Sequence, residues 1–471
     1  NKHNTMQKTL LFSAVLAMAS TMAVAQTDIT PEVIKQLQAS HQETVADKAI
    51  RRALSQNSVA SLTSSENGII EIGTDFSDVV PTKGITNQLS SGRCWLFTGM
   101  NVLRSKAIMR WNLPKLELSQ NYLFFYDQLE KANLFLQGVI DTRKSSFDDR
   151  MVDWLFQNPI SDGGTFCGVA DLVQKYGVVP SEVFPETYQS NNTSGFTSVL
   201  KMKLREMGLE LRTLGENKKT TDAQLQAKKV EMLGTVYYML TLAYGVPPTE
   251  FTWSQRDQKD KVVSTETYTP QSFYKKYWDG ENLYDNYIMV MNDPLREYYK
   301  VYQIDYDRHT YDGHDWVYLN LPVEEIKPMA IASIKDSTAM YFSCDVGKFM
   351  NRKNGTLTMN NFDYESLFGI KLGMDKKQRV QTHASGSSHA MTMIAVDIDK
   401  ESGKTKKWMV ENSWGASSGY KGNVIMTDEW FDNYMFRLVI NKKYVDKKYI
   451  DMLNQKPTKL PAWDPMFMME E

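Results

Sequence analysis

The chain has 471 residues, a formal net charge of −2, an apolar fraction of 42% and a charged fraction of 23%. These values are typical of a soluble globular enzyme; they exclude an intrinsically disordered chain and give no positive charge excess that would indicate nucleic-acid binding. A chain of this length can bury one large core or two to three smaller ones.

The N-terminal residues predict an export signal. Lys8 precedes an apolar run that ends in Ala23-Val24-Ala25, which matches a charged start, an apolar centre and a small-residue cleavage site. We expect cleavage after Ala25 and an exported protein, either periplasmic or extracellular. The run is short for a membrane span and a polar segment follows it, so a stably anchored protein is the weaker alternative.

Helices are expected in the first half of the chain. Residues 26–75 predict a helical lead-in, with Thr30-Pro31 as its start signal. Ser90 and Ser91 can cap a helix over residues 90–110, where apolar side chains recur at intervals of three and four residues.

Further helices follow. Ser119 is expected to open one, and residues 195–245, rich in Lys, Leu, Met and Glu, predict two helices joined near Gly215.

The second half changes character. Short β-prone runs separated by Gly, Ser and Lys turns occupy residues 390–399, 406–414, 422–427 and 436–441. Helices first and strands later indicate an α+β protein with two facing parts, and the cleft between the parts is the expected site.

Three cysteines, Cys94, Cys167 and Cys344, leave at least one thiol outside any disulfide. Cys167 and Cys344 could pair in an exported protein, but we favour two buried apolar thiols. Cys94 would lie in the first turn of the helix expected at 90–110, where the positive end of the helix dipole favours a thiolate. Arg93 beside it is expected to be a flanking structural or surface residue.

A catalytic thiol also needs a histidine. The chain has six, at positions 3, 41, 309, 314, 383 and 389. His309 and His314 stand among aspartates in "DRHTYDGHDW", but their spacing matches no zinc or calcium pattern, so we favour a solvated turn over a metal site. His389 opens a strand-like run and is the best candidate for the base.

Two more residues complete the candidate site. Asn412 follows His389 by 23 residues (412 − 389), far enough for a hairpin to bring its amide oxygen to one ring N–H and fix the tautomer. Gln88 lies six residues before Cys94, and its amide could join the Cys94 backbone N–H in binding an oxyanion.

At this point the sequence resembles the papain-like cysteine peptidases, and within them the bleomycin hydrolase and aminopeptidase C group. The matching stretches run in order from about residue 80 to 466: "NQLSSGRCW", "SDGG", "LVQKYGVVP", "FTWSQRD", "TPQSFY", "NDPLREYY", "AIASIKD", "CDVGK", "SHAMTM", "VENSWG" and "LPAWDPM".

The resemblance implies Cys94 as nucleophile, His389 as general base and then acid, Asn412 as orienting residue and Gln88 as oxyanion donor. It also implies that Trp414 shields the His389–Asn412 pair from water. Gly163 and Gly164 match the segment whose backbone pairs with the substrate strand, which missing side chains permit; without the resemblance, a plain turn would be the preferred interpretation.

The implied fold is papain-like α+β, with a helical part facing a β-barrel-like part across a cleft. His389 follows Cys94 by 295 residues (389 − 94) instead of roughly 130–150, which implies large helical insertions. We therefore expect a signal peptide at 1–25, the lead-in at 26–75, the helical half at 76–194, a mainly helical insertion at 195–320, the β-rich half at 321–460 and a C-terminal tail in the cleft at 461–471.

The tail carries the specificity hypothesis. In the family it returns into the cleft and presents its terminal carboxylate, here that of Glu471, to the free α-ammonium of the substrate. A frayed end is the alternative. This tail, "FMMEE", is bulkier than the small-residue tail typical of the group, and "SSHAMT" replaces a more usual residue pair before the histidine.

The sequence thus predicts an exported cysteine aminopeptidase that acts on peptides and forms a homo-oligomer, a hexamer in the family. The alternatives are an endopeptidase or oligopeptide-releasing peptidase and, less favoured, a catalytically silent peptide-binding scaffold. No cofactor, metal, nucleic acid or stable membrane span is expected.

Overall fold

The computed structural model describes residues 28–65, 68–113, 115–464 and 466. The predicted signal peptide and Glu471 therefore lie outside the described residues. Contacts divide the chain into two units that meet between Leu62 and Thr63. Within the described ranges, no helix is both long and apolar enough to cross a membrane.

The first unit contains the predicted lead-in, which forms two helices where one was expected. Helix α2 (Pro31–Ser40) begins after Thr30, whose hydroxyl accepts from the Val33 N–H. Helix α3 (Val45–Leu54) begins at a capping box between Thr44 and Asp47, which starts a new helix and so interrupts the predicted one. A short helix, α4 (Val59–Thr63), contains the boundary.

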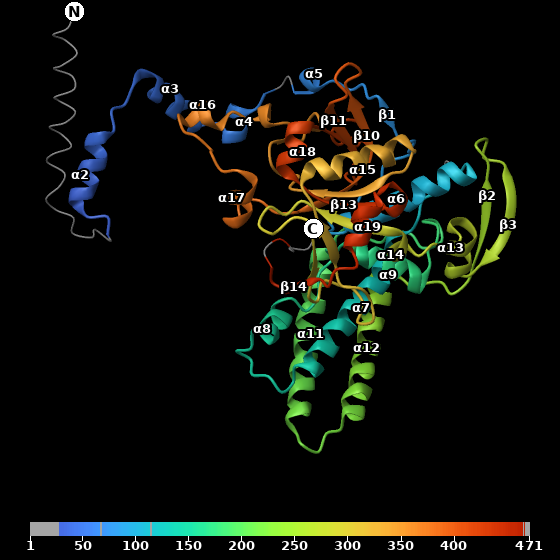
Figure 1. Ribbon diagram of the computed structural model, residues 1–471. Coiled ribbons are helices and arrows are strands. Elements are labelled where there is room, and N and C mark those ends of the chain that lie inside the picture. The colour runs from blue at the N-terminus through green and yellow to red at the C-terminus, as the bar shows by residue number, and fades with distance from the viewer. Residues whose placement is uncertain (1–27, 66–67, 114, 465, 467–471) are drawn as a thin grey trace, which may run out of the picture. The chain divides into compact units, whose positions relative to one another are not determined.

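The second unit is α+β, as predicted. A long buried helix, α7, packs against α9 and against the hairpin formed by α11 and α12 (Figure 1). The helices of this part are α5 (Gly68–Ile72), α6 (Cys94–Trp111), α7 (Gln120–Asp141), α8 (Arg150–Gln157), α9 (Phe166–Tyr176), α10 (Tyr188–Asn191), α11 (Thr193–Glu216), α12 (Asp222–Tyr244), α13 (Pro270–Trp278) and α14 (Leu283–Asn286).

One twelve-stranded sheet forms the other part. Its order is β14-β5-β6-β4-β13-β7-β10-β11-β12-β9-β8, with β1 paired to β10, and β2 and β3 form a separate hairpin. The strands are β1 (Asp78–Val79), β2 (Phe251–Arg256), β3 (Val262–Tyr268), β4 (Tyr287–Met291), β5 (Lys300–Ile304), β6 (Val317–Asn320), β7 (Met340–Cys344), β8 (Met350–Asn351), β9 (Thr356–Leu357), β10 (His389–Ile398), β11 (Thr405–Glu411), β12 (Asn423–Thr427), β13 (Met435–Asn441) and β14 (Thr458–Leu460).

Two hydrophobic clusters match the two parts. One lies among the helices and includes Cys94 and Trp95, and the other lies on the sheet and includes Cys344 and Trp408. Helices α15 (Val323–Lys335) and α18 (Asp428–Tyr434) pack on the sheet, and α6 packs against β10 and β7. The remaining helices are α16 (Tyr364–Phe368), α17 (Lys376–Gln381) and α19 (Lys447–Met452).

Several expectations are confirmed and one, the start of the nucleophile helix, is corrected. Ser119 caps α7, and α11 ends just after Gly215, as predicted. Residues 195–320, expected to be mainly helical, also contain the five strands β2 to β6. The helix expected from residue 90 begins at Cys94 instead, because Ser91 is engaged elsewhere: its hydroxyl donates to the Gln88 carbonyl at 2.6 Å.

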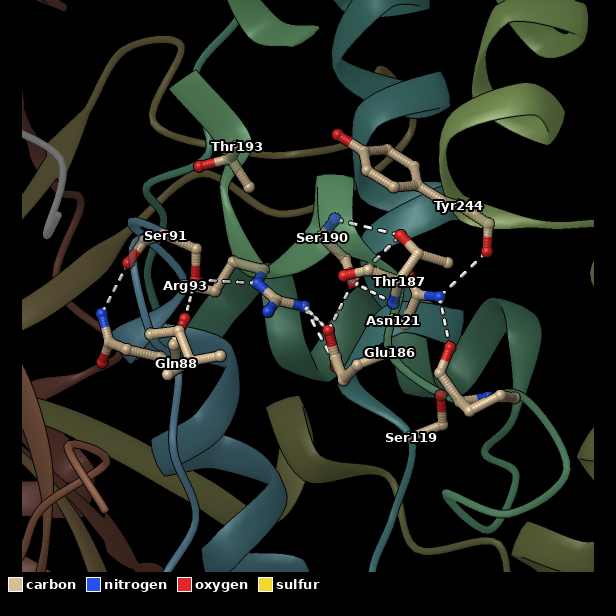
Figure 2. A network of polar contacts seen from close by, with 12 residues as sticks. Gln88, Ser91, Arg93, Ser119, Asn121, Glu186, Thr187, Ser190, Thr193 and Tyr244 are labelled. Atoms are coloured by element: carbon tan, nitrogen blue, oxygen red, sulfur yellow. Dashed lines mark hydrogen bonds and ion pairs between the residues drawn. The ribbon is translucent and has the colours of Figure 1, made fainter. Parts of the chain in front are cut away.

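The start of α6 is held by a buried cation. Arg93, with no exposed surface, pairs with Glu186 at 2.9 Å and donates from Nε to the Ser91 hydroxyl at 3.0 Å (Figure 2). Its guanidinium also lies over the rings of Phe97 and Phe124 at 5.1 and 5.2 Å. Arg93 is thus a structural residue, and the alternative of a surface residue is wrong.

We expect Arg93→Met to lower the free energy of unfolding by about 2–3 kcal/mol, because it leaves Glu186 without its cation; the loss is below that of a fully buried pair since Glu186 stays 28% exposed. Urea unfolding monitored by fluorescence measures this difference. Arg110→Met is the control on the same helix, since Arg110 pairs with Asp279 in an exposed ion pair and its loss should cost much less. Equal losses in both variants would contradict the structural role.

Candidate active site

Cys94 is the first residue of α6 and has no exposed surface. The first backbone N–H groups of a helix have no partner within that helix and carry partial positive charge. The thiol therefore lies where an anion is favoured, as predicted for the first turn.

His389 and Asn412 come together from neighbouring strands. His389 opens β10 opposite Cys344 of β7, while Asn412 follows β11, which pairs with β10. Asn412 Oδ1 lies 2.9 Å from His389 Nε2 and also accepts from the Ser413 N–H at 2.8 Å. Because that oxygen can only accept, Nε2 carries the ring proton and Nδ1 is left as the basic nitrogen.

Trp414 packs against His389. Its ring centroid lies 4.9 Å from that of His389, and Arg352 lies over the same tryptophan at 4.8 Å. Burial lowers the pKa of His389 to about 4; the Asn412 hydrogen bond opposes the shift and the Arg352 charge adds to it. The imidazole is therefore neutral at neutral pH unless an anion forms beside it.

Gln88 is fixed at both ends of its amide. Oε1 accepts from the Ser413 hydroxyl at 2.6 Å, and Nε2 donates to the Ser91 carbonyl at 2.7 Å (Figure 2 shows the second contact). Since Nε2 carries two hydrogens, a second N–H is left for a ligand.

Two loops tie the helical part to the sheet. The N–H of Gln88 donates to the Ser413 carbonyl at 2.8 Å, and the N–H of Gly415 donates to the Thr86 carbonyl at 3.1 Å. Between these two bonds, Asn87 and Trp414 form an isolated antiparallel β-bridge. The segment before Cys94 thus pairs with the segment after Asn412. This ladder brings the residues predicted at positions 88, 94, 389, 412 and 414 into one region.

The predicted glycine segment lies beside Trp95, the residue after Cys94. The Trp95 indole donates to the Asp162 carbonyl at 2.9 Å. A Cβ added at Gly164 would lie 2.2 Å from His309 Cε1 and 2.7 Å from Trp95 Cδ2, so no side chain fits there. Gly163 accepts from Lys131 Nζ at 2.5 Å through its carbonyl.

A cavity of about 540 Å³ adjoins the site. Ser387 and Ser388, which precede His389, line it together with Ser161 of the glycine segment and with 462–464 of the C-terminal segment. The following described residue, Met466, is buried, and its carbonyl accepts from Arg437 Nη2 at 3.0 Å. The C-terminal segment therefore reaches the immediate vicinity of the histidine strand.

The prediction for His309 is wrong and that for His314 is right in part. His309 is buried, at 2% exposure, where a solvated turn was expected. His314 is half-exposed, stacks on Tyr284 at 3.7 Å and pairs with Asp171 at 2.6 Å. Among the residues that the structure describes, no three His, Cys, Asp or Glu side chains form a group that could hold a metal ion.

Other findings concern the thiols and a missed residue. Cys167 and Cys344 are separate buried thiols, so the favoured alternative to a disulfide is confirmed.

Sequence reasoning missed Ser413, whose hydroxyl donates to the Gln88 amide oxygen and fixes the amide. The only signal for Ser413 in the sequence is its place between Asn412 and Trp414 in "VENSWG".

A model of the peptidase C1-like family matches residues 28–467. The chain belongs to this family. It is 39% identical to bleomycin hydrolase of Mus musculus over 404 residues, which cover 84% of this chain and 89% of that protein. It is 36% identical to aminopeptidase E of Lactobacillus helveticus over 439 residues, or 93% and 99% of the two chains.

The crystal structure of pepw from Lactobacillus rhamnosis HN001 has a TM-score of 0.90 to this chain at 34% identity, with 94% of this chain and all of that chain covered. The predicted resemblance and the papain-like α+β fold are confirmed. The chain is a papain-like cysteine peptidase, so the prediction that it is an enzyme of this class is confirmed as well.

The Cys94→Ser variant, which cannot form a thiolate, should hold His389 neutral until the pH falls to about 4. The unfolded chain, with a histidine pKa near 6.5, takes up this proton first as the pH falls. Stability from this group is thus fully present above pH 6.5 and is lost between about pH 6.5 and 4. NMR of histidine labelled at Cε1 gives the pKa, and Cys94→Ser/His389→Asn identifies the signal. Titration of His389 near 6.5 in Cys94→Ser would contradict the burial argument.

Proposed function

We propose that this enzyme is a cysteine aminopeptidase that releases N-terminal residues from peptides through an acyl-enzyme on Cys94. The observation that carries the proposal is that residues 462–464 line the same cavity as Ser388, directly before His389, so a C-terminal segment forms one side of that cavity. Relatives named aminopeptidase E and bleomycin hydrolase support it.

Acylation begins with transfer of the Cys94 thiol proton to His389 Nδ1. The sulfur attacks the scissile carbonyl carbon, and the carbonyl oxygen becomes an oxyanion that binds the second Gln88 N–H and the Cys94 backbone N–H. Asn412 holds the imidazolium through Nε2. His389 then returns the proton to the leaving amine as the C–N bond breaks, which leaves a thioester on Cys94.

Deacylation repeats these steps with water. His389 Nδ1 removes a proton from the water molecule, whose oxygen attacks the thioester carbonyl, and the same two N–H groups bind the oxyanion. The C–S bond breaks, the thiol regains its proton and the amino acid leaves as a carboxylate. Burial keeps His389 neutral at the start, so its Nδ1 lone pair is available to accept the proton.

The glycine segment would hold the substrate backbone. The main chain of Gly163 and Gly164, next to Asp162 and Trp95, would pair with a peptide that approaches as an added strand. The C-terminal tail, with the carboxylate of Glu471 at its end, would then meet the free α-ammonium. N-blocked peptides would be rejected because they cannot supply this partner to the carboxylate.

Three broader proposals accompany this one. The signal at 1–25 would export the protein, and the enzyme would assemble as a homo-oligomer, a hexamer by resemblance. Residues 76–194 and 321–460 would be the two halves of the catalytic domain, with residues 195–320 as an insertion between them. Peptides rather than folded proteins are the substrates that fit a site closed on one side.

Gln88→Ala should lower kcat by about 100- to 1000-fold with little change in KM, because the lost N–H binds the oxyanion and not the ground state; this corresponds to about 2.7–4 kcal/mol. Steady-state kinetics with an aminoacyl fluorogenic amide measure the effect. Ser413→Ala, which keeps the amide but frees its Oε1, should lose only about tenfold. A Gln88→Ala loss confined to KM would count against the oxyanion role.

An aminopeptidase should cleave free aminoacyl amides at least about 100-fold faster than their N-acetylated forms. Deletion of residues 467–471 should reduce this ratio by raising activity on the acetylated substrate. Initial rates on matched substrate pairs measure both, with Cys94→Ser as the inactive control. Equal turnover of the two substrates by the intact enzyme would instead indicate an endopeptidase, and absence of a Cys94 adduct with an epoxide inhibitor would indicate a silent scaffold.

A further inference from the structure

A buried polar cluster lies under the glycine segment, outside the catalytic residues. Asp127 and Lys131 lie one turn apart on α7, and His309 comes from the loop after β5; their exposures are 0%, 6% and 2%. Lys131 Nζ lies 2.9 Å from one Asp127 oxygen, and His309 Nδ1 lies 2.5 Å from the other. Proton transfer during peptide hydrolysis uses none of these three groups.

The cluster binds the main chain of residues 161–165. Lys131 Nζ donates to the carbonyls of Gly163 at 2.5 Å and Ser161 at 3.1 Å, and Gln128 donates to the same Ser161 carbonyl at 2.8 Å. His309 Nε2 accepts from the Thr165 N–H at 3.2 Å. Buried side chains thus hold the segment on both sides of Gly164.

The hydrogen bonds define the form of His309. Since Nε2 accepts from a backbone N–H, the ring proton is on Nδ1 and is donated to Asp127. Burial and the Lys131 charge lower the pKa of His309, while Asp127 opposes the shift. Burial raises the pKa of Asp127, but the nearby Lys131 charge and, to a smaller extent, His309 lower it, and the net shift is downward. A neutral imidazole between a carboxylate and a backbone N–H is the arrangement that these contacts require.

The imidazole also fits the glycines closely. A Cβ at Gly164 would lie 2.2 Å from the His309 ring, and a Cβ at Gly168, in the first turn of α9, would lie 2.3 Å from it. The ring also lies 4.6 Å from that of Trp95, the residue after Cys94. The histidine therefore packs against both the glycine segment and the start of α6.

We propose that His309, together with Asp127 and Lys131, positions the Gly163–Gly164 main chain for pairing with the substrate backbone. The proposal rests on the proposed function for its assignment of those glycines. His309 acts through the segment and not on the reacting atoms, so its loss slows peptide hydrolysis while leaving the Cys94–His389 chemistry in place.

Two variants divide the contacts of His309. In His309→Asn the amide can still donate to Asp127 but does not reach Thr165, whereas in His309→Gln it can still accept from Thr165. We expect His309→Asn to lower kcat/KM for an aminoacyl amide about 10- to 100-fold, the scale of a misplacement of about 1 Å, and His309→Gln to recover part of that loss. Alkylation of Cys94 by iodoacetamide needs no substrate strand, so its rate should change less than about threefold.

His314→Asn is the matched control. It removes a histidine from the same loop that also pairs with an aspartate, Asp171, but that lies on the exposed side, away from the glycines. Both rates should stay at the wild-type level. If His309→Asn does not fold, Asp127→Asn/Lys131→Met removes the buried charges together, leaves no unpaired ion and should show the same difference between hydrolysis and alkylation.

Equal loss of hydrolysis and alkylation in these variants would overturn the proposal, because it would show a general structural role; unchanged hydrolysis would overturn it too. Failure of the aminopeptidase proposal is distinguishable, since it appears in the wild-type enzyme as equal cleavage of free and acetylated peptides. In that case the hydrolysis rate is measured with a peptide that the enzyme does cleave, and it is compared with the rate of Cys94 alkylation in the same way.

Discussion

The site depends on the ladder between residues 86–88 and 413–415. Cys94 belongs to the helical part, and His389 and Asn412 belong to the sheet, so each part alone carries an incomplete set of reactive groups. Two backbone hydrogen bonds and the Gln88–Ser413 side-chain contact join the parts where the reactive groups meet. The same contact that joins the parts also orients the amide that we propose binds the oxyanion, which would couple the interface between the parts to the chemistry.

Around this ladder the molecule relies on buried polar groups for rigidity. Arg93 anchors the start of α6, directly before Cys94, through its ion pair with Glu186. Lys131 and His309 hold the glycine segment, and Arg437 binds the C-terminal segment at Met466. Each binds oxygen or nitrogen partners in the low-dielectric interior, where an unpaired polar group is costly. Cys167 and Cys344 form no disulfide, so non-covalent contacts of this kind hold the segments together.

Local patterns in the sequence predicted the local structure. The Ser119 cap, the two helices around Gly215 and the four late strands follow from capping and periodicity, and Cys94 lies in the first turn that was expected. The errors came from side-chain partners that these patterns do not encode, in one case nearby and in the other distant in sequence. The Ser91 hydroxyl hydrogen-bonds to Gln88 and Arg93 instead of capping α6. His309 is buried because Asp127 of α7, 182 residues earlier, binds its ring. No spacing rule within "DRHTYDGHDW" contains that information.

The long separation of the reactive residues has a consequence for biosynthesis. His389 follows Cys94 by 295 residues (389 − 94), and at about 5–20 residues per second roughly 15–60 seconds pass between their syntheses. Throughout that interval the growing polypeptide has a thiol but neither its base nor the 413–415 loop. During this interval a nascent chain is therefore unable to digest itself or its neighbours on the ribosome. The order of the elements in the sequence delays proteolytic activity until the chain is finished.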